Sequence, residues 1–156
     1  MQPSAQNLAD GKRWEGSSLK VYLDSRGYAT QGIGRHHGIK KGDPDIDEAT
    51  QARWFAEDWA ASYALALTLF PKLDSIDKVR RDALIWLTFN MGIDTLSQFE
   101  PFIRYVRLQK WSEAAFHVLT NLSGHLTPYV LQVGARAEET GLRIATGEIL
   151  EEFACN

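Results

Sequence analysis

The sequence predicts an α+β protein, in which a small lobe built on a β-hairpin is joined by a long helix to a larger helical lobe. Residues 18–34 are rich in β-branched and aromatic residues and contain glycines, which is typical of two short strands and a turn. From about residue 47 the apolar residues recur every three or four positions, which predicts helices. We therefore expect one domain, divided as follows: small lobe about 12–50, linking helix about 47–69, and helical lobe about 70–150 together with the N-terminal helix.

Composition and charge limit the possible classes of protein. The 156 residues include 44% hydrophobic ones, enough for one domain with a real core. No stretch approaches the roughly 20 apolar residues of a membrane span, and residues 1–12 contain no apolar signal core. We expect a monomer that is made in the cytoplasm and has no stable membrane association. The net charge of -3 does not favour nucleic-acid binding, and the lone Cys155 excludes an intrachain disulfide.

The chain should begin with a helix over residues 4–14. Ser4 is the expected N-cap, Leu8 and Trp14 are expected on the buried side, and Gly16 is expected to end the helix. Two strand-like runs follow, with a turn at residues 25–27.

The remaining elements should be helical. Alanine and aromatic residues recur at helical spacing from Asp47, and this long helix should end before Pro71. Further helices are expected at the following places: from Asp77 to Gly92, over 101–108, over 113–122 with Ser112 as cap, and from Thr127 towards Gly147 with a break at Gly141.

Three residues near the predicted hairpin suggest chemistry. Glu15 should lie at the C-terminal end of a helix, where the backbone carbonyls disfavour a charged carboxylate and suit a general acid. Asp24 should lie at the hairpin turn, and Thr30 on the returning strand. Two carboxyl groups and a group that holds a water are the parts needed to cleave a glycosidic bond.

Each of the three residues also has a purely structural interpretation. Taken alone, Glu15 is a surface glutamate, Asp24 an aspartate that binds its own turn, and Thr30 a good strand residue. Asp24 and Thr30 share a face of the hairpin only if Thr30 lies opposite Tyr22 or at an equivalent position, and the sequence leaves that register open.

The order of these residues resembles that of the phage T4-type lysozymes, glycoside hydrolase family 24. The spacing Glu15-x8-Asp24-x5-Thr30 runs into the motif Tyr22-x-Asp24-x-x-Gly27-Tyr28-x-Thr30-x-Gly32-x-Gly34. Later segments extend the resemblance over about residues 8–147, and they are as follows: residues 74–84, 89–92, 111–115 and 127–128. The resemblance implies a lysozyme-like fold.

The resemblance also implies an activity and a role for each site residue. Members of the family hydrolyse the β-1,4 bond between N-acetylmuramic acid and N-acetylglucosamine in peptidoglycan, and the best-studied ones invert the anomeric centre. By similarity, Glu15 is the general acid, Asp24 orients the attacking water, and Thr30 holds that water. Further residues are expected to bind the glycan, and they are as follows: Gly34, Arg35, Phe89 and Asn90. No metal or other cofactor is implied.

The resemblance further suggests a biological setting. The partner would be peptidoglycan glycan strands, and the protein would be a phage or prophage endolysin that causes host cell lysis. It would be made in the host cytoplasm, leave through a separate holin-type pore, and act in the periplasm on the cell wall. The alternatives are a lytic transglycosylase, which typically needs one acidic residue, and a non-catalytic wall-binding module of the same fold.

Arg35 is the sharpest departure from the family pattern, because the best-known relative has a histidine after the equivalent of Gly34. We expect Arg35 to pair with an acidic group, first Glu15 and next an acid of residues 43–48, since arginine stays charged and forms paired hydrogen bonds to carboxylates. Asn90 is expected either to reach a sugar amide or to satisfy backbone groups.

Two other groups of residues admit a functional interpretation. The pair His36 and His37 with the acids of residues 43–48 suggests a metal, but adjacent strand histidines point to opposite faces, and Asp47 suits a helix N-terminus. Four tryptophans at helical spacing are expected to pack in the core rather than stack on sugars, and they are as follows: Trp54, Trp59, Trp86 and Trp111.

Overall fold

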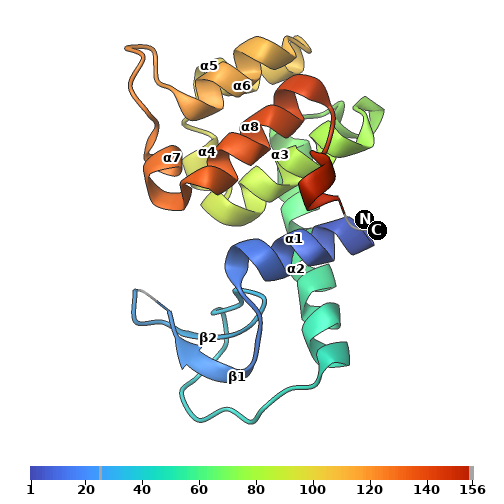
Figure 1. The fold of residues 1–156 in the computed structure, drawn as a ribbon, viewed down its shortest axis with the longest axis vertical. Coiled ribbons are helices and arrows are strands. Elements are labelled where there is room, and N and C mark those ends of the chain that lie inside the picture. Colours follow the sequence, from blue (N-terminus) through green and yellow to red (C-terminus); the bar gives the residue numbers. More distant parts are fainter. Residues whose placement is uncertain (25, 155–156) are drawn as a thin grey trace. The chain divides into compact units, whose positions relative to one another are not determined.

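The computed structural model describes residues 1–24 and 26–154. It consists of two compact units, residues 1–60 and residues 61–154, and the α+β class predicted from the sequence is confirmed (Figure 1). Cys155 and Ser25, the first residue of the expected turn, lie outside the described residues.

The first unit contains the hairpin and the N-terminal helix. Its elements are α1 (Ala5–Glu15), β1 (Ser18–Leu23), β2 (Ala29–Gly32) and the first turns of α2 (Glu48–Leu69). Ser4 caps α1 as expected: its hydroxyl accepts from the Asn7 backbone N–H, and the Asn7 side chain accepts from the Ser4 backbone in return.

Helix α1 packs differently from the expectation. Leu8 and Trp14 are only half-buried, whereas the buried positions are Asn7, Asp10 and Gly11. A Cβ atom at Gly11 would lie 3.0 Å from the Phe55 ring and 3.1 Å from the Ile33 side chain. The small residue thus lets the helix approach the core of the first unit, and α1 belongs to that unit rather than to the helical lobe.

The hairpin is antiparallel, with Tyr22 opposite Thr30 and Leu23 opposite Ala29. The buried Gln31 joins it to the loop that follows, because its amide donates to the carbonyls of Leu19 at 2.8 Å and Pro44 at 3.0 Å. These bonds satisfy a polar group that would be costly to bury alone.

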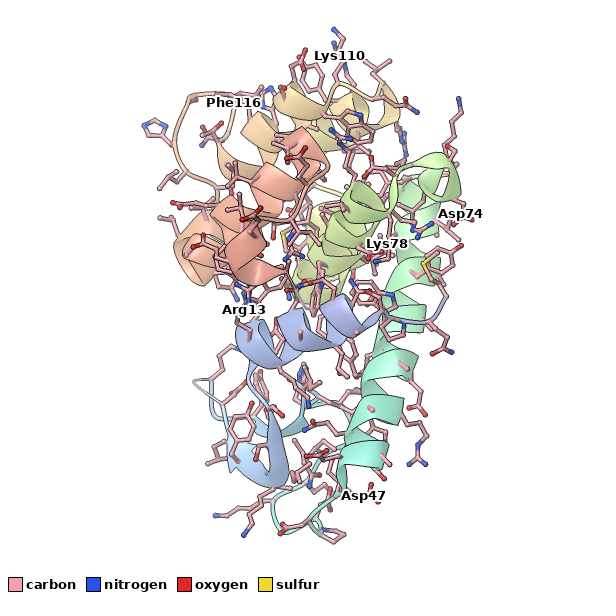
Figure 2. All side chains as sticks on the ribbon, turned by 45° about the vertical axis from the view of Figure 1, so that its right-hand side comes forward. Arg13, Asp47, Asp74, Lys78, Lys110 and Phe116 are labelled. Atoms are coloured by element: carbon pink, nitrogen blue, oxygen red, sulfur yellow. The ribbon has the colours of Figure 1, made fainter. Side chains whose placement is uncertain are left out.

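Helix α2 begins one residue after Asp47, whose carboxylate accepts from the Thr50 backbone N–H at 2.7 Å (Figure 2). The hydrogen bond from the Thr50 hydroxyl, followed by the one from the Thr50 backbone N–H, lowers the pKa of Asp47. Phe55, Trp59 and Ala66 form the buried side of the helix. No helix in the described part of the chain is both long enough and apolar enough to span a membrane.

The second unit is helical. Its further elements are η1 (Leu73–Ser75), α3 (Lys78–Met91), α4 (Ile93–Leu96), α5 (Glu100–Arg107), α6 (Trp111–Leu119), α7 (Pro128–Val133), α8 (Ala135–Thr146) and η2 (Glu151–Phe153). Its core lies where α3 and α8 are flanked by α5 and α6, and it includes the following side chains: Leu84, Trp86, Phe102, Val118 and Ile144.

Three details of the second unit differ from the sequence-based expectation. Helix α6 begins at Trp111, so Ser112 is not its cap, and it ends at Leu119. The last helical stretch breaks at Gly134, which has φ 57°, and not at Gly141. Gly141 lies inside α8, where an added Cβ would approach Leu119 to 2.8 Å. This glycine therefore permits close helix packing, which a sequence pattern cannot distinguish from a helix break.

Arg80 ties the start of α3 to the end of α8. Its guanidinium donates to the carbonyls of Ile144 at 2.8 Å and Ala145 at 2.9 Å, pairs with Asp77 at 2.8 Å, and lies over the Trp111 ring at 4.9 Å. The arginine thus satisfies carbonyls that a helix C-terminus leaves without intrahelical partners.

We predict that Gly147→Ala destabilises the second unit more than Gly124→Ala does. Both glycines have φ near 75–78°, which costs any other residue about 1 kcal/mol, but a Cβ at position 147 would also lie 2.6 Å from the Arg80 guanidinium. Position 124 has nothing within 4 Å. The free energy of unfolding should fall by about 1–2 kcal/mol more for the 147 variant. Equal losses in urea denaturation would show that Arg80 yields without cost.

Candidate active site

Glu15 is the last residue of α1, which ends where Gly16 adopts φ 77°. The side chain is half-buried against the backbone of Gly34: a Cβ at that glycine would lie 3.1 Å from Glu15 Cβ and 3.5 Å from Oε2. Gly34 itself has φ 71°. Position 34 therefore requires glycine for two independent reasons, the backbone conformation and the space that Glu15 occupies.

Asp24 is held by the hairpin turn. Its Oδ1 accepts from the backbone N–H groups of Tyr28 at 2.8 Å and Arg26 at 2.9 Å, and the Arg26 guanidinium lies 3.7 Å from Oδ2. The hydrogen bond from Tyr28, followed by the bond and charge of Arg26 and the charge of His36, lowers the pKa of Asp24. The carboxylate is thus fixed in place and kept ionised.

Thr30 is directly opposite Tyr22 in the hairpin, which is the register that the shared face requires. Tyr22 and Thr30 are direct cross-strand neighbours, so their side chains project from the same side of the ribbon. Asp24 follows the last residue of β1, and its charge acts on the Tyr22 phenol. Thr30 is only 2% exposed, and its hydroxyl donates to the Tyr28 carbonyl at 3.1 Å. Its oxygen lone pairs remain able to accept a hydrogen bond.

Tyr22 is a candidate site residue that the sequence reasoning did not single out. Burial, the charge of Asp24 and then the charge of Glu15 raise the pKa of its phenol. The two carboxyl groups therefore both act on one hydroxyl. The available signal in the sequence was position, because Tyr22 precedes Asp24 by two residues at the end of the first strand-like run.

Arg35 does not pair with Glu15 or with residues 43–48, so that expectation is wrong. Its guanidinium forms two hydrogen bonds with Asp58, at 2.7 and 3.0 Å, and a third with Glu57 at 3.1 Å. It also lies over the Trp54 ring at 5.0 Å. Burial alone would lower the pKa of Arg35, but the bonds to Asp58 and then Glu57 raise it.

The reason for this pairing is the direction of the strand. Gln31 donates from its backbone N–H to the Arg35 carbonyl at 2.8 Å, which closes a tight turn. The Arg35 side chain lies against α2, where two nitrogens of its planar guanidinium donate to the two carboxylate oxygens of Asp58. A pairing with α2 could not be read from sequence, because the acids are more than 20 positions away.

Phe89 and Asn90 lie near the C-terminal end of α3, in the second unit. The Phe89 ring packs edge-on against Trp86, with the ring centroids 5.1 Å apart. Both residues are half-buried. Their contact with a glycan stays a prediction.

His36 packs against an aromatic ring. Its imidazole lies 5.8 Å from the Tyr28 ring centroid. Across residues 1–24 and 26–154, no group of three or more His, Cys, Asp and Glu side chains is placed to hold a metal ion.

The four tryptophans divide into two pairs. Trp59 and Trp86 are fully buried, as expected for core residues. Trp54 and Trp111 are half-buried, and each carries an arginine over its ring.

The fold, in which a helix that ends at Glu15 is followed by a two-stranded hairpin and a helical unit, is that of the lysozyme class of proteins. The profile of the phage lysozyme family matches residues 12–125, and the chain belongs to that family. It is also similar to two proteins of Dictyostelium discoideum, "Probable T4-type lysozyme 1" and "Probable T4-type lysozyme 2", at 27% and 26% identity. Each alignment covers 73% of this chain and 82% of the relative.

We predict that Gly34→Ala lowers the rate of cell-wall hydrolysis by about 100-fold, because the added methyl group displaces the Glu15 side chain and small displacements at a reacting group are costly. Gly38→Ala is the matched control, since Gly38 has φ 79° and nothing within 4 Å. Turbidity loss of permeabilised Gram-negative cell walls measures the rate. Equal rates for the two variants would mean that Glu15 tolerates the displacement.

We predict that Arg35→Ala lowers the free energy of unfolding by about 1–2 kcal/mol, because the partly buried Asp58 loses a paired cation. The alkaline limb of the pH–rate profile should stay in place, since Arg35 binds α2 and not Glu15. The control is Arg53→Ala, which removes an exposed arginine 3.9 Å from Glu57. A shift of the alkaline limb in Arg35→Ala but not in Arg53→Ala would show that the charge of Arg35 does act on Glu15, and it would contradict the prediction.

Proposed function

We propose that this protein is a peptidoglycan hydrolase that cleaves the β-1,4 bond between N-acetylmuramic acid and N-acetylglucosamine. The proposal is supported by membership of the phage lysozyme family and by one geometric observation. That observation is the register that pairs Tyr22 with Thr30, because the charges of Asp24 and Glu15 both act on the Tyr22 phenol, which lies directly across the hairpin from Thr30.

The proposed mechanism assigns one task to each group. Glu15 gives its proton to the oxygen of the leaving sugar, so that the departing group leaves as an alcohol. Asp24, kept ionised by the turn, stabilises positive charge on the sugar ring and orients a water. Thr30 accepts a hydrogen bond from that water, which then attacks the anomeric carbon.

We propose an inverting outcome. Attack by water on the face opposite the leaving group requires room between the two carboxyl groups, roughly 6.5–9.5 Å in inverting enzymes. Asp24 acts in this mechanism as a base and a charge stabiliser. It is not the nucleophile, because its Oδ1 already accepts hydrogen bonds from two backbone N–H groups.

Two other functions remain as alternatives. A lytic transglycosylase of this fold would cleave the same bond without water and leave an anhydro sugar. The presence of both Asp24 and Thr30, which could orient and hold a water, favours the hydrolytic alternative. A non-catalytic wall-binding module was suggested by the possibility that Arg35 neutralises Glu15. The pairing of Arg35 with Asp58 removes that argument.

The biological setting is part of the proposal. We propose a phage or prophage endolysin that is made in the host cytoplasm, passes through a separate holin-type pore, and lyses the host by degrading the wall in the periplasm. Glycan strands are the proposed partner, bound by Gly34, Arg35, Phe89 and Asn90, with no nucleic acid, no membrane and no second subunit involved.

We predict that Glu15→Gln lowers the rate of peptidoglycan hydrolysis at least about 1,000-fold while the thermal midpoint stays within a few degrees, since glutamine keeps the size but cannot donate the proton. The exposed Glu48→Gln is the matched control. Products of the unmodified protein on purified peptidoglycan should carry reducing muramic acid ends. Anhydro ends would establish a transglycosylase, no product would establish a binding module, and a fast Glu15→Gln variant would place the acid elsewhere.

A further inference from the structure

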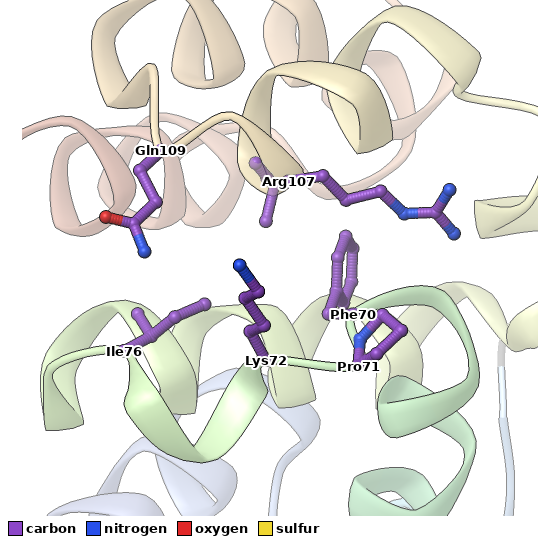
Figure 3. A pocket seen from close by; sticks show the side chains of 7 residues that line it. Phe70, Pro71, Lys72, Ile76, Arg107 and Gln109 are labelled. Atoms are coloured by element: carbon purple, nitrogen blue, oxygen red, sulfur yellow. The ribbon is translucent and has the colours of Figure 1, made fainter.

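The second unit contains a pocket that the proposed hydrolysis does not use. It has a volume of about 340 Å³ and lies between the segment that follows α2 and the C-terminal end of α5. Its lining includes the buried apolar side chains of Phe70, Ile76 and Val106, and Figure 3 shows Phe70 and Ile76 on one side of the pocket. The size is at the lower end of the range for ligand-binding pockets.

Cationic and amide groups line the mouth of this pocket. Figure 3 shows the Lys72 ammonium and the Gln109 amide directed into the same space, whereas the Arg107 guanidinium extends away from them, past Phe70. Arg107 Nε donates to the Leu69 carbonyl at 2.8 Å, which fixes the guanidinium stem. Positive charge beside an apolar lining is complementary to a molecule with an apolar body and a carboxylate head.

The described carboxylates do not neutralise these cations. Over residues 1–24 and 26–154, neither Lys72 nor Arg107 forms an ion pair within 4.0 Å. Asp74, close to Lys72 in sequence, accepts from the Tyr63 hydroxyl with both oxygens at 2.9 Å. Glu100 lines a smaller neighbouring pocket that shares Arg107, so Lys72 carries most of the free charge at the mouth.

The backbone conformation of Gln109 is a second observation that favours a binding role for this pocket. Gln109 is the non-glycine residue with positive φ in the described chain, at 55°, and it follows the end of α5, where glycine is normally found. The Lys110 backbone N–H donates to the Tyr105 carbonyl at 2.9 Å. This bond caps the C-terminus of α5, with Gln109 in the left-handed conformation. A glutamine at this position is conformationally costly, and its side chain lines the pocket.

We propose that this pocket binds a small free organic carboxylate, with its apolar part on Phe70, Ile76 and Val106 and its carboxylate between Lys72 and Gln109. A volume of about 340 Å³ equals that of roughly eleven water molecules at about 30 Å³ each, so the pocket has room for a small acid. A peptide end is a poorer fit, because Gln109 is the one uncharged polar side chain in the lining and the backbone groups of a peptide would stay unpaired.

The test is an NMR titration of the full chain with hexanoate and with hexanamide, its neutral counterpart of equal size. Hexanoate should bind with a Kd of about 1 mM and shift the backbone amides of residues 70–76 and 106–109, and hexanamide should bind at least about fivefold more weakly. Equal binding of the two probes, or shifts elsewhere in the chain, would overturn the proposal.

Variants separate the pocket from general charge and from folding. Lys72→Met should reduce hexanoate affinity to that of hexanamide, whereas Lys41→Met, which removes an exposed charge in the first unit, should leave it unchanged. Gln109→Gly should weaken hexanoate about two- to fivefold while the thermal midpoint holds or rises, because glycine accepts φ 55° without strain. Unchanged affinity in Lys72→Met, or tighter binding of N-acetylglycylleucine than of hexanoate, would refute a site for small acids.

Discussion

The close approach of the Gly34 backbone to the Glu15 side chain is the contact on which the candidate site depends. A methyl group at position 34 would meet Glu15 Cβ at 3.1 Å, so the space for the carboxyl group is shaped by the absence of a side chain. The same residue has φ 71°, which turns the chain away from the hairpin and towards Arg35. One glycine therefore sets both the position of the proposed acid and the direction of the loop that follows it.

Arg35 continues the effect of that turn. Its two bonds to Asp58 and its third to Glu57 attach the loop to α2 within the same unit. A bidentate arginine–carboxylate pair fixes geometry as well as charge, since the two planar groups meet along an edge. The departure from the histidine of the best-known relative thus serves the scaffold of the site and leaves the proposed acid free of a fixed cation from Arg35.

Local patterns predicted much of this molecule. The cap at Ser4, the hairpin over residues 18–32 and the long helix from Asp47 follow from capping chemistry and from hydrophobic periodicity, which act over a few residues. The order Glu15, Asp24, Thr30 indicated the family, and the structure supplied the hairpin register that the sequence left open.

Three of the errors share one physical origin, which is contact between residues far apart in the chain. The partner of Arg35 lies on α2, the burial of Gly11 depends on Phe55, and the role of Gly141 depends on Leu119. In each case a local rule gave a reasonable alternative, such as a nearby acid or a helix break. Long-range packing then determined which alternative was realised.

The way the hairpin holds Asp24 has a consequence for folding. The groups of the candidate site lie within residues 15–34, and the Asp24 carboxylate is bonded to N–H groups two and four positions away. Closing short loops costs little chain entropy, and each doubling of loop length adds roughly 0.6 kcal/mol. The second unit differs, since Arg80 bonds to carbonyls 64 and 65 positions along the chain. Asp24 is therefore held by contacts between residues close together in the chain. Such contacts have a lower contact order than the Arg80 contacts of the second unit, and they can form earlier in folding.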